Sequence, residues 1–282
     1  MLIDTHSHIN FGDYEKDREE VIKRSLESGT WMINVGTNYE TSKEVVEIAK
    51  RYKQGVFAAI GLHPINVVQG TGYKAQGTRC KIESAGDFED ILEEDFDAEK
   101  YKKLVVPGKV VAVGEIGLDY WSKPKTKKRL EEFKRKQKEI FLKQLELARE
   151  LGLPVIFHCR LAHNDLLETL GLHVTSYTLQ GVVHCFTGDW SQAQKYLEKG
   201  LYLGFNGIIF KLNLDEIIKK TPLERMLVET DCPFLVPPGV NTQRNEPIFV
   251  KYVAQRIAEI KRVSFEKVAE ITTENAKRLF RI

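Results

Sequence analysis

Two histidines separated by a single residue follow the first apolar stretch of the chain. His6 and His8 come after Leu2, Ile3 and Asp4, which read as the start of a short buried strand. Side chains two residues apart on an extended backbone point to the same face, so both imidazoles can address one point in space. Neutral imidazole is a common ligand for zinc, manganese and related ions. On its own, the pair could equally be two solvated or hydrogen-bonded histidines near a terminus. Whether the two side chains bind metal therefore has to be judged from residues elsewhere in the chain.

Short apolar runs alternate with longer amphipathic runs along most of the sequence. The runs predict strands over residues 2–4, 31–35, 56–60, 110–113, 155–157, 181–183, 201–205 and 226–228. They predict helices over residues 13–28, 41–52, 127–151, 164–170, 191–199, 212–220 and 245–260, and two more after Ser264, the last over 274–279. Such alternation favours a parallel sheet, and the simplest closure is a single (β/α)8 TIM-type barrel with extra C-terminal helices. The alternative is an open doubly wound sheet, but no glycine-rich dinucleotide loop follows the first strand.

Residues 66–98 interrupt this alternation. Residues 69–86 are rich in glycine and poor in apolar side chains, and an acidic stretch follows. We therefore expect one barrel domain over residues 1–282 with a loop insertion around residues 66–98. Because the insertion follows the third strand, it is expected to influence the choice of substrate.

Six potential metal ligands stand at the expected carboxyl ends of five strands, where function gathers in barrels of this kind. Each has a simpler explanation alone, such as a helix cap or a core histidine, but buried charges are rarely left unpaired. Four histidines and two carboxylates exceed the needs of one tetrahedral ion, which predicts two divalent ions that share a carboxylate. Such a pair polarises a substrate oxygen and generates hydroxide at neutral pH, the chemistry of hydrolases. The six residues are His6, His8, Glu115, His158, His184 and Asp231.

Two of these six are expected to carry the chemistry. Glu115 follows the fourth strand and is placed to bridge two cations. Asp231 follows the eighth strand, across the barrel, and a carboxylate there can accept a proton from the attacking water. Asp119 and Glu229 are expected to accept hydrogen bonds that orient the ligand histidines.

Several motifs together resemble those of the TatD-type metal-dependent deoxyribonucleases, which belong to the amidohydrolase-like barrels. The motifs occur in that family's order and span nearly the whole chain. They are Asp4-Thr5-His6-Ser7-His8, Gly61-Leu62-His63-Pro64, Gly114-Glu115-Ile116-Gly117-Leu118-Asp119-Tyr120, His184-Cys185-Phe186-Thr187-Gly188, Glu229-Thr230-Asp231 and Arg244-Asn245-Glu246-Pro247.

The resemblance implies a ligand set and an activity. One ion would be held by His6, His8, Glu115 and Asp231, and the other by Glu115, His158 and His184. The implied reaction is 3′→5′ exonuclease-like hydrolysis of DNA, single-stranded or at frayed ends, with Mg²⁺, Mn²⁺ or Zn²⁺. The chain departs from the family in its long segment 69–86. It also has Leu161 after Arg160, where the family often has an acidic residue, so the orientation of Arg160 does not follow from the resemblance.

Four further residues are predicted to contact the substrate. His63 is expected to donate to a phosphate, the alternative being a loop histidine beside a turn-forming proline. Arg160 could bind a phosphate in a bidentate fork, or form a salt bridge to a helix. Arg244 and Asn245 fit a helix N-terminus that faces the rim, which is a natural anion site.

A basic run over residues 123–129 follows Tyr120 and Trp121. Aromatic side chains beside basic ones can stack bases and bind the nucleic-acid backbone, although such a run also fits a solvated face. With a formal net charge of only +2, any nucleic-acid contact has to come from such a local patch. The basic residues are Lys123, Lys125, Lys127, Lys128 and Arg129.

Composition and the remaining motifs limit the classes of function. The four cysteines are scattered and form no CxxC pair, which argues against a zinc ribbon and favours a reducing cytoplasm. No secretory or membrane-spanning segment is evident, so we expect a cytoplasmic protein without a membrane partner, more often monomeric than not. The rivals to a nuclease are hydrolysis of a cyclic amide or of the ester of a misaminoacylated tRNA, and a non-catalytic nucleic-acid-binding protein.

Overall fold

The computed structural model describes residues 1–67, 96–174 and 179–282. Its centre is an eight-stranded sheet in which all neighbours are parallel and the order is β1 to β8. The sheet closes where the end of β1 meets the chain after β8, because Ser7 pairs with Cys232 and the His8 N–H donates to the Cys232 carbonyl at 2.9 Å. The predicted barrel is confirmed. The strands are β1 (Leu2–Ser7), β2 (Thr30–Val35), β3 (Val56–Ile60), β4 (Val110–Asp119), β5 (Val155–Arg160), β6 (Gly181–Val183), β7 (Tyr202–Phe205) and β8 (Met226–Val228).

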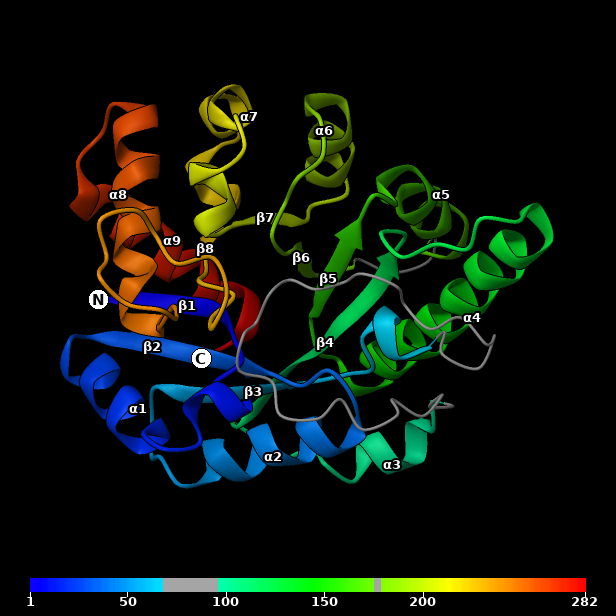
Figure 1. Cartoon of the computed structure of the whole chain (residues 1–282), viewed down its shortest axis with the longest axis horizontal. Coiled ribbons are helices and arrows are strands. Elements are labelled where there is room, and N and C mark those ends of the chain that lie inside the picture. Colours follow the sequence, from blue (N-terminus) through cyan, green and yellow to red (C-terminus); the bar gives the residue numbers. More distant parts are fainter. Residues whose placement is uncertain (68–95, 175–178) are drawn as a thin grey trace.

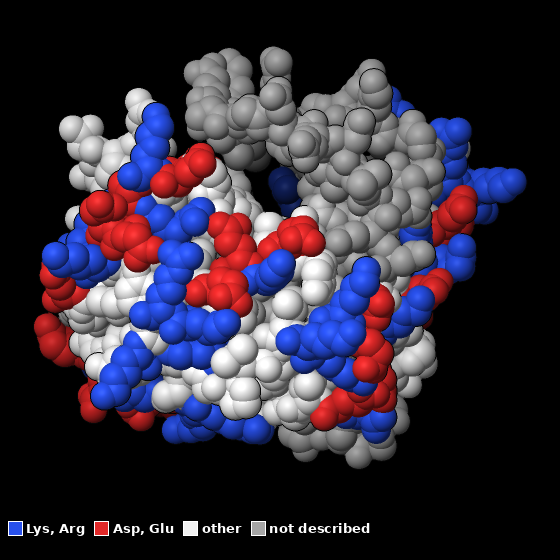
Figure 2. Space-filling view, turned by 90° about the horizontal axis from the view of Figure 1, so that it is seen from below, with Lys and Arg blue, Asp and Glu red and all other residues white. Residues whose placement is uncertain are grey.

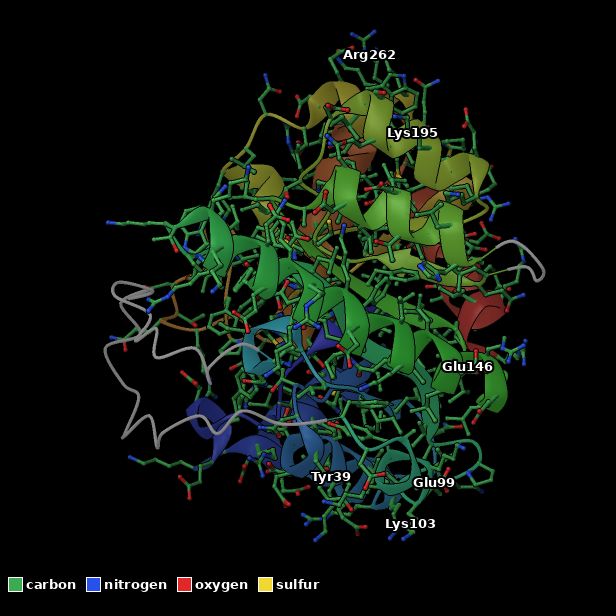
Figure 3. The ribbon with its side chains drawn as sticks, turned by 90° about the vertical axis from the view of Figure 1, so that its right-hand side faces the viewer. Tyr39, Glu99, Lys103, Glu146, Lys195 and Arg262 are labelled. Atoms are coloured by element: carbon green, nitrogen blue, oxygen red, sulfur yellow. The ribbon has the colours of Figure 1, made fainter. Side chains whose placement is uncertain are left out.

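Helices surround this sheet, and Figure 1 shows α4 lying along the outside of β4. Their apolar faces pack against the outward-facing strand residues and form the larger part of the core. The charged side chains of the helices face away from it, as the labelled Glu146 of α4 and Lys195 of α6 do in Figure 3. The helices are α1 (Arg18–Glu27), α2 (Tyr39–Lys50), α3 (Ala98–Lys102), α4 (Lys127–Leu151), α5 (His163–His173), α6 (Trp190–Glu198), α7 (Asp215–Lys220), α8 (Val250–Lys261) and α9 (Phe265–Phe280).

The interior of the barrel is apolar at one end and polar at the other. Ile3, Phe57, Ile156 and Leu227 belong to an interior cluster that also contains Phe280 of α9, so this helix covers the amino ends of the strands. Side chains alternate between the two faces of a strand, so the interior-facing positions further along are those two and four residues later. On β5, and in the segments that follow β6 and β8, those later positions carry ionisable residues singled out above, whereas on β1 a register shift between Asp4 and Ser7 intervenes before His8.

Three strands are longer than the sequence suggested. β1, β4 and β5 continue to Ser7, Asp119 and Arg160, so several candidate ligands lie within strands and not just after them. The glycine-containing end of β4 reads as a loop from composition, yet it pairs with β5 as far as Asp119. Gly117 permits this close pairing, since a Cβ there would lie 2.0 Å from the carbonyl oxygen of His158.

The C-terminal helices also differ from expectation. α8 begins at Val250, five residues after the predicted start at 245, and the two helices expected after Ser264 are one, α9. Side chains of α9 at four-residue intervals, from Val268 through Thr272 to Ala276, are all buried and form one continuous face. Ser264 caps this helix, because its Oγ accepts from the Lys267 N–H at 3.2 Å.

The expected insertion around residues 66–98 lies largely outside the described residues, of which only 66–67 and 96–98 belong to it. Within the described part, none of the helices combines the length and the apolar character needed to cross a membrane. Figure 2 looks onto the side of the molecule that carries α1, α2 and α3, where basic and acidic side chains are intermixed.

Candidate metal centre

The structure brings all six predicted ligands together at the carboxyl ends of the strands. His6, Glu115 and His158 lie on β1, β4 and β5, and His184 and Asp231 follow β6 and β8. The imidazoles of His6 and His184 stack with their ring centroids 3.9 Å apart. Side chains from five strands thus converge on one buried point.

Glu115 lies at the middle of this convergence and uses both carboxylate oxygens. Its Oε1 is 2.5 Å from Nδ1 of His158 and 2.7 Å from Nε2 of His184. Its Oε2 is 3.4 Å from Nε2 of His6. One oxygen therefore faces each half of the centre, which is the arrangement that a carboxylate shared by two cations needs.

The second carboxylate belongs to the half that contains β1. Oδ1 of Asp231 is 3.5 Å from Nε2 of His8 and 3.8 Å from Nε2 of His6. These three side chains can offer one ligand atom each within 4.8 Å of one another. His6, Glu115 and His184 form a second such group. The two groups overlap at His6, and either could hold a metal ion.

Outer contacts aim the imidazole nitrogens at the centre. A carbonyl can only accept, so Nδ1 of His8 donates to the Val35 carbonyl at 2.9 Å and leaves Nε2 free to bind. Nε2 of His158 donates to Asp119 at 3.0 Å, which leaves Nδ1 facing Glu115. The orienting contact expected of Asp119 is therefore present. Nδ1 of His6 has no hydrogen-bond partner among the described residues.

Glu229 stands behind His184, with Oε1 3.3 Å from Nδ1 of the imidazole. The same oxygen accepts from the Cys185 N–H at 2.7 Å and from the Asn206 amide at 3.2 Å. Gly204 leaves room for this carboxylate, since a Cβ there would lie 2.5 Å from its Oε2. Glu229 is thus held in place by neighbouring strands and can orient His184.

Asp4 is a positioning residue that the sequence did not reveal. Its buried carboxylate accepts from the Thr230 N–H at 2.8 Å and from the Thr230 hydroxyl at 2.6 Å. These bonds fix the turn that carries Asp231 against β1. The signal was available, because a carboxylate in an apolar strand needs a buried partner.

His63 adds a fifth imidazole beside the six ligands. Its Nε2 is 3.2 Å from Nδ1 of His158 and 3.5 Å from Oε1 of Glu115. A backbone N–H can only donate, so the Ile65 N–H bond of 3.0 Å makes Nδ1 of His63 an acceptor. In the neutral ring Nε2 then carries the proton. His63 accordingly presents an N–H donor to the centre. A protonated nitrogen cannot bind a metal ion, so His63 is a poor metal ligand, although it lies close enough to Asp119 and His158 to form a group of three candidate ligands.

The other three predicted substrate contacts have different surroundings. Arg160 lies at the rim with its guanidinium 4.2 Å from the ring centre of Trp121. Arg244 pairs with Asp17 and lies over the ring of Tyr14 at 4.5 Å. Asn245 is 1% exposed, and its amide donates to three backbone carbonyls of the segment that follows β8.

Arg244 and Asn245 lie just before a 3-10 turn over Pro247–Phe249 that leads into α8 at Val250, so the helix starts later than the expected residue 245. The terminal guanidinium nitrogens of Arg244 and the amide of Asn245 contact other groups of the protein. Asn245 holds the segment that carries Asp231, which is a positioning role. A role of Arg244 in substrate binding stays a prediction.

The charges of the centre fit divalent cations. Burial alone would raise the pKa of Glu115, but the imidazoles of His184, His63 and His158 lower it well below its usual range. Burial alone would lower the pKa of His158, but Glu115 and Asp119 raise it to about 9. Glu115 and Glu229 likewise overcome burial and raise the pKa of His184 well above its ordinary value. Without metal, His158 and His184 therefore carry protons, and their positive charge attracts Glu115. Bound cations would replace those protons.

Metal binding near pH 7 should accordingly release protons. His158 and His184 are protonated there in the metal-free protein and must become neutral to act as ligands. The apparent affinity for Mn²⁺ or Zn²⁺ should increase as the pH is raised toward about 9. The stability of the metal-free fold has the opposite dependence on pH. The charged pairs stabilise the metal-free fold below the ordinary imidazole pKa, and this contribution is lost as the pH rises through about 9.

Calorimetric titration in two buffers of different ionisation enthalpy measures this release. The observed heat should differ between the buffers by an amount that corresponds to at least one proton. Heats that are independent of the buffer would show that the imidazoles are already neutral.

Comparison with known proteins agrees with this geometry. Residues 3–281 match the family model described as TatD related DNase. The chain is 40% identical to the "uncharacterized metal-dependent hydrolase YabD" of Bacillus subtilis (strain 168), over 100% of both chains. It is 30% identical to the "3'-5' ssDNA/RNA exonuclease TatD" of Pectobacterium parmentieri (strain WPP163), again over 100% of both.

Among solved structures, the chain is similar to YJJV, a TatD homologue from Escherichia coli K12. The TM-score is 0.79 at 30% identity, and the match covers 100% of this chain and 98% of the other. The predicted resemblance and the predicted enzyme class, a metal-dependent hydrolase acting on ester bonds, are confirmed. The chain belongs to the family of TatD-related DNases.

Proposed function

We propose that this protein removes nucleotides from the 3′ end of single-stranded DNA at a centre that holds two divalent ions. The observation that carries the proposal is the position of Glu115, which directs one oxygen to each of two groups of imidazoles. Paired cations bridged by a carboxylate are the usual machinery for phosphodiester hydrolysis. The name of the Pectobacterium relative, which specifies single-stranded DNA and RNA, supports the substrate class and the polarity.

We assign the ligand sets that the family resemblance implies to the two halves of the centre. His6, His8, Asp231 and Oε2 of Glu115 would hold one ion, and Oε1 of Glu115 with His158 and His184 would hold the other. When bound, Mg²⁺, Mn²⁺ or Zn²⁺ would supply Lewis-acid polarisation of the phosphoryl group and acidification of water.

The remaining steps belong to the side chains. Asp231 accepts the proton of the attacking water, and its pKa suits a base that is ionised at neutral pH. Burial alone would raise that pKa, but the adjacent imidazoles of His8, His6 and His184 lower it. His63 donates from Nε2 to a phosphoryl oxygen, and Arg160 binds a phosphate oxygen at the rim. Together these groups orient the phosphodiester and move one proton.

The rival reactions have less support. Cyclic-amide hydrolases of similar fold often bridge their ions with a carboxylated lysine, and here the corresponding strand offers Glu115. Lys109 precedes β4, at the opposite end of the barrel, and its ammonium group donates to the Tyr52 and Lys53 carbonyls. The ester of a misaminoacylated tRNA and a non-catalytic nucleic-acid-binding role remain as outcomes of the test. We place the activity in the cytoplasm and assign it to a monomer.

A panel of substrates tests the proposal. Metal-free protein is reconstituted with Mn²⁺ and given 5′-labelled single-stranded DNA, single-stranded RNA, blunt duplex DNA and an aminoacyl-tRNA. The proposal expects a ladder of products from single-stranded DNA, shortened from the 3′ end, and slower digestion of the duplex. Release of the amino acid from tRNA with no shortening of any strand would favour the ester hydrolase.

The basic run at the start of α4 should add electrostatic affinity. Lys125, Lys127 and Lys128 are exposed and follow the rim segment after β4. Their replacement by glutamine should weaken the binding of single-stranded DNA and flatten its salt dependence, because fewer counterions are released. Fluorescence anisotropy at several salt concentrations measures both quantities.

A matched control is the triple replacement of Lys43, Lys50 and Lys53 by glutamine. These lysines are exposed on α2 and just after it. The control removes the same charge and should change binding much less. Equal effects of the two triple variants would mean that only net charge matters and that the basic run is a solvated face.

A further inference from the structure

A partly exposed tryptophan stands at the rim and is stacked by an arginine. The indole of Trp121 is 53% exposed, and the guanidinium of Arg160 lies 4.2 Å from its ring centre. In the described part of the chain, no carboxylate lies within ion-pairing distance of Arg160. This chain has Leu161 after Arg160, where the family often has an acidic residue. In the structure the ring of Trp121 contacts the guanidinium instead.

This pair is tied directly to the ligands. Oδ1 of Asp119 accepts from the backbone N–H of Trp121 at 2.8 Å. Oδ2 of the same carboxylate accepts from Nε2 of His158 at 3.0 Å. Asp119 is also the register partner of Arg160. Arg160 lies two residues beyond His158 on β5, so both side chains are on the interior-facing side of that strand. The stacked pair is therefore one step outward from the metal centre.

Two further apolar side chains are exposed in segments that follow other strands of the barrel. Ile65 and Leu161 are 44% and 63% exposed and follow β3 and β5, on the same rim as Trp121. Gln137 of α4 ties two of these segments together, because its amide donates to the Pro64 carbonyl at 3.3 Å and to the Asp119 carbonyl at 3.1 Å. An apolar surface does not help to bind a phosphate, but it can pack against the flat face of a nucleobase.

We propose that Trp121 and Arg160 form a stacking platform for the nucleobase next to the scissile phosphate. The inference rests on the proposed nuclease function and names the part of the rim that recognises an unpaired base. Bases inside a duplex have both faces covered by their neighbours, so only an unstacked base can lie on the platform. The platform thereby favours single strands and frayed ends.

Arg160 serves two purposes in this arrangement. A guanidinium that lies over a ring keeps its N–H groups in the plane of the group, where they remain available to a phosphate oxygen. One face of the guanidinium thus stacks on the aromatic ring, while the N–H groups at its edge bind the phosphate backbone of the DNA. A lysine in its place would keep the charge but lose the flat surface.

Binding of two DNA strands to wild-type protein, to variants of Trp121 and Arg160, and to two control variants tests the platform. One strand is intact, and the other is identical except that its 3′-terminal nucleotides lack their bases. Trp121→Ala should weaken binding of the intact strand by about tenfold, within the range found when a stacking aromatic is removed, and Trp121→Phe should retain most of the affinity. The strand without terminal bases should bind wild-type protein and Trp121→Ala equally and weakly. Anisotropy of a 5′-fluorescein label measures the dissociation constants, and the pre-steady-state cleavage rate provides the second readout.

Two matched controls separate the platform from general effects. Leu172→Ala removes another exposed apolar side chain, 68% exposed at the far end of α5. Arg225→Lys matches Arg160→Lys, since the Arg225 guanidinium lies 5.3 Å from the Tyr202 ring centre at the amino ends of the strands. Both controls should bind like wild-type protein, whereas Arg160→Lys should bind the intact strand more weakly.

Three results would contradict the inference. Trp121→Ala could bind the intact strand as tightly as wild-type protein, or it could lose the same affinity for both strands. If Trp121→Ala fails to show a cooperative thermal transition, Arg160→Lys decides, and wild-type affinity in that variant counts against the platform. Wild-type protein that neither binds nor cleaves either strand would overturn the proposed function and this inference with it, whereas normal cleavage with unaffected variants would overturn the inference alone.

Discussion

Replacing Glu115 by glutamine should abolish nearly all hydrolysis and remove most of the bound metal. The carboxylate faces both halves of the centre, and its charge offsets the repulsion of two cations that such sites hold ~3.5–4 Å apart. Glutamine keeps the shape but is neutral, and its amide N–H groups would face imidazole nitrogens that must accept a metal. Elemental analysis after reconstitution should give close to two equivalents of Mn²⁺ for wild-type protein and far fewer for the variant.

The control for this change is Glu168→Gln, which neutralises an exposed carboxylate of α5. It should bind metal and cleave DNA like wild-type protein. Two equivalents of metal in Glu115→Gln, or a wild-type value that saturates below one equivalent under excess metal, would be incompatible with a carboxylate-bridged pair.

The second large effect is expected for Asp231→Asn. The variant should fold and retain much of its affinity for DNA, yet turn over at least ~10²-fold more slowly, because a general base typically contributes 10²–10⁴ to the rate. Asp231 has a positive φ of 57°, a conformation that asparagine adopts more readily than most residues, so the backbone is not an obstacle. The measurement is the single-turnover rate at saturating Mn²⁺ and saturating protein.

Asp231→Asn also separates metal binding from proton transfer. If the variant binds two equivalents of metal and cleaves at the wild-type rate, Asp231 is not the base. If it loses one equivalent, the effect on the rate belongs to the missing ligand, and Asp231 is a ligand first. A slow variant with two equivalents supports the assignment made here.

The candidate ligands could be predicted from the sequence because their position depends on local rules. Strands of parallel barrels end at one rim, and alternate residues share a face, so His158 and His184 had to lie near one another once the strands were recognised. His6 lies on the same rim, although β1 has a register shift between Asp4 and Ser7 that alternation does not predict. The length of β4 could not be predicted in the same way. Its continuation depends on pairing with β5, and glycines such as Gly117 read as loop residues when the neighbouring strand is unknown.

Residues whose role depends on distant partners were harder to assign. Arg244 and Asn245 were expected at a helix N-terminus, but Asp17, Tyr14 and the segment after β8 take up their polar groups. Conversely, Trp121 and Arg160 were each noted, but the sequence could not show that they stack. Such contacts are set by the packing of the segments that follow the strands and have no signature in spacing or periodicity.

The most direct test of the central claim follows the shortening of a 5′-labelled single-stranded DNA while Mn²⁺ is added in steps to metal-free protein. Single-turnover conditions remove any contribution from product release. The two-ion nuclease predicts a ladder of products shortened from the 3′ end, with a rate that rises until about two equivalents of metal per chain are present. Absence of shortening at every metal ratio, or equal shortening by Glu115→Gln, would contradict it.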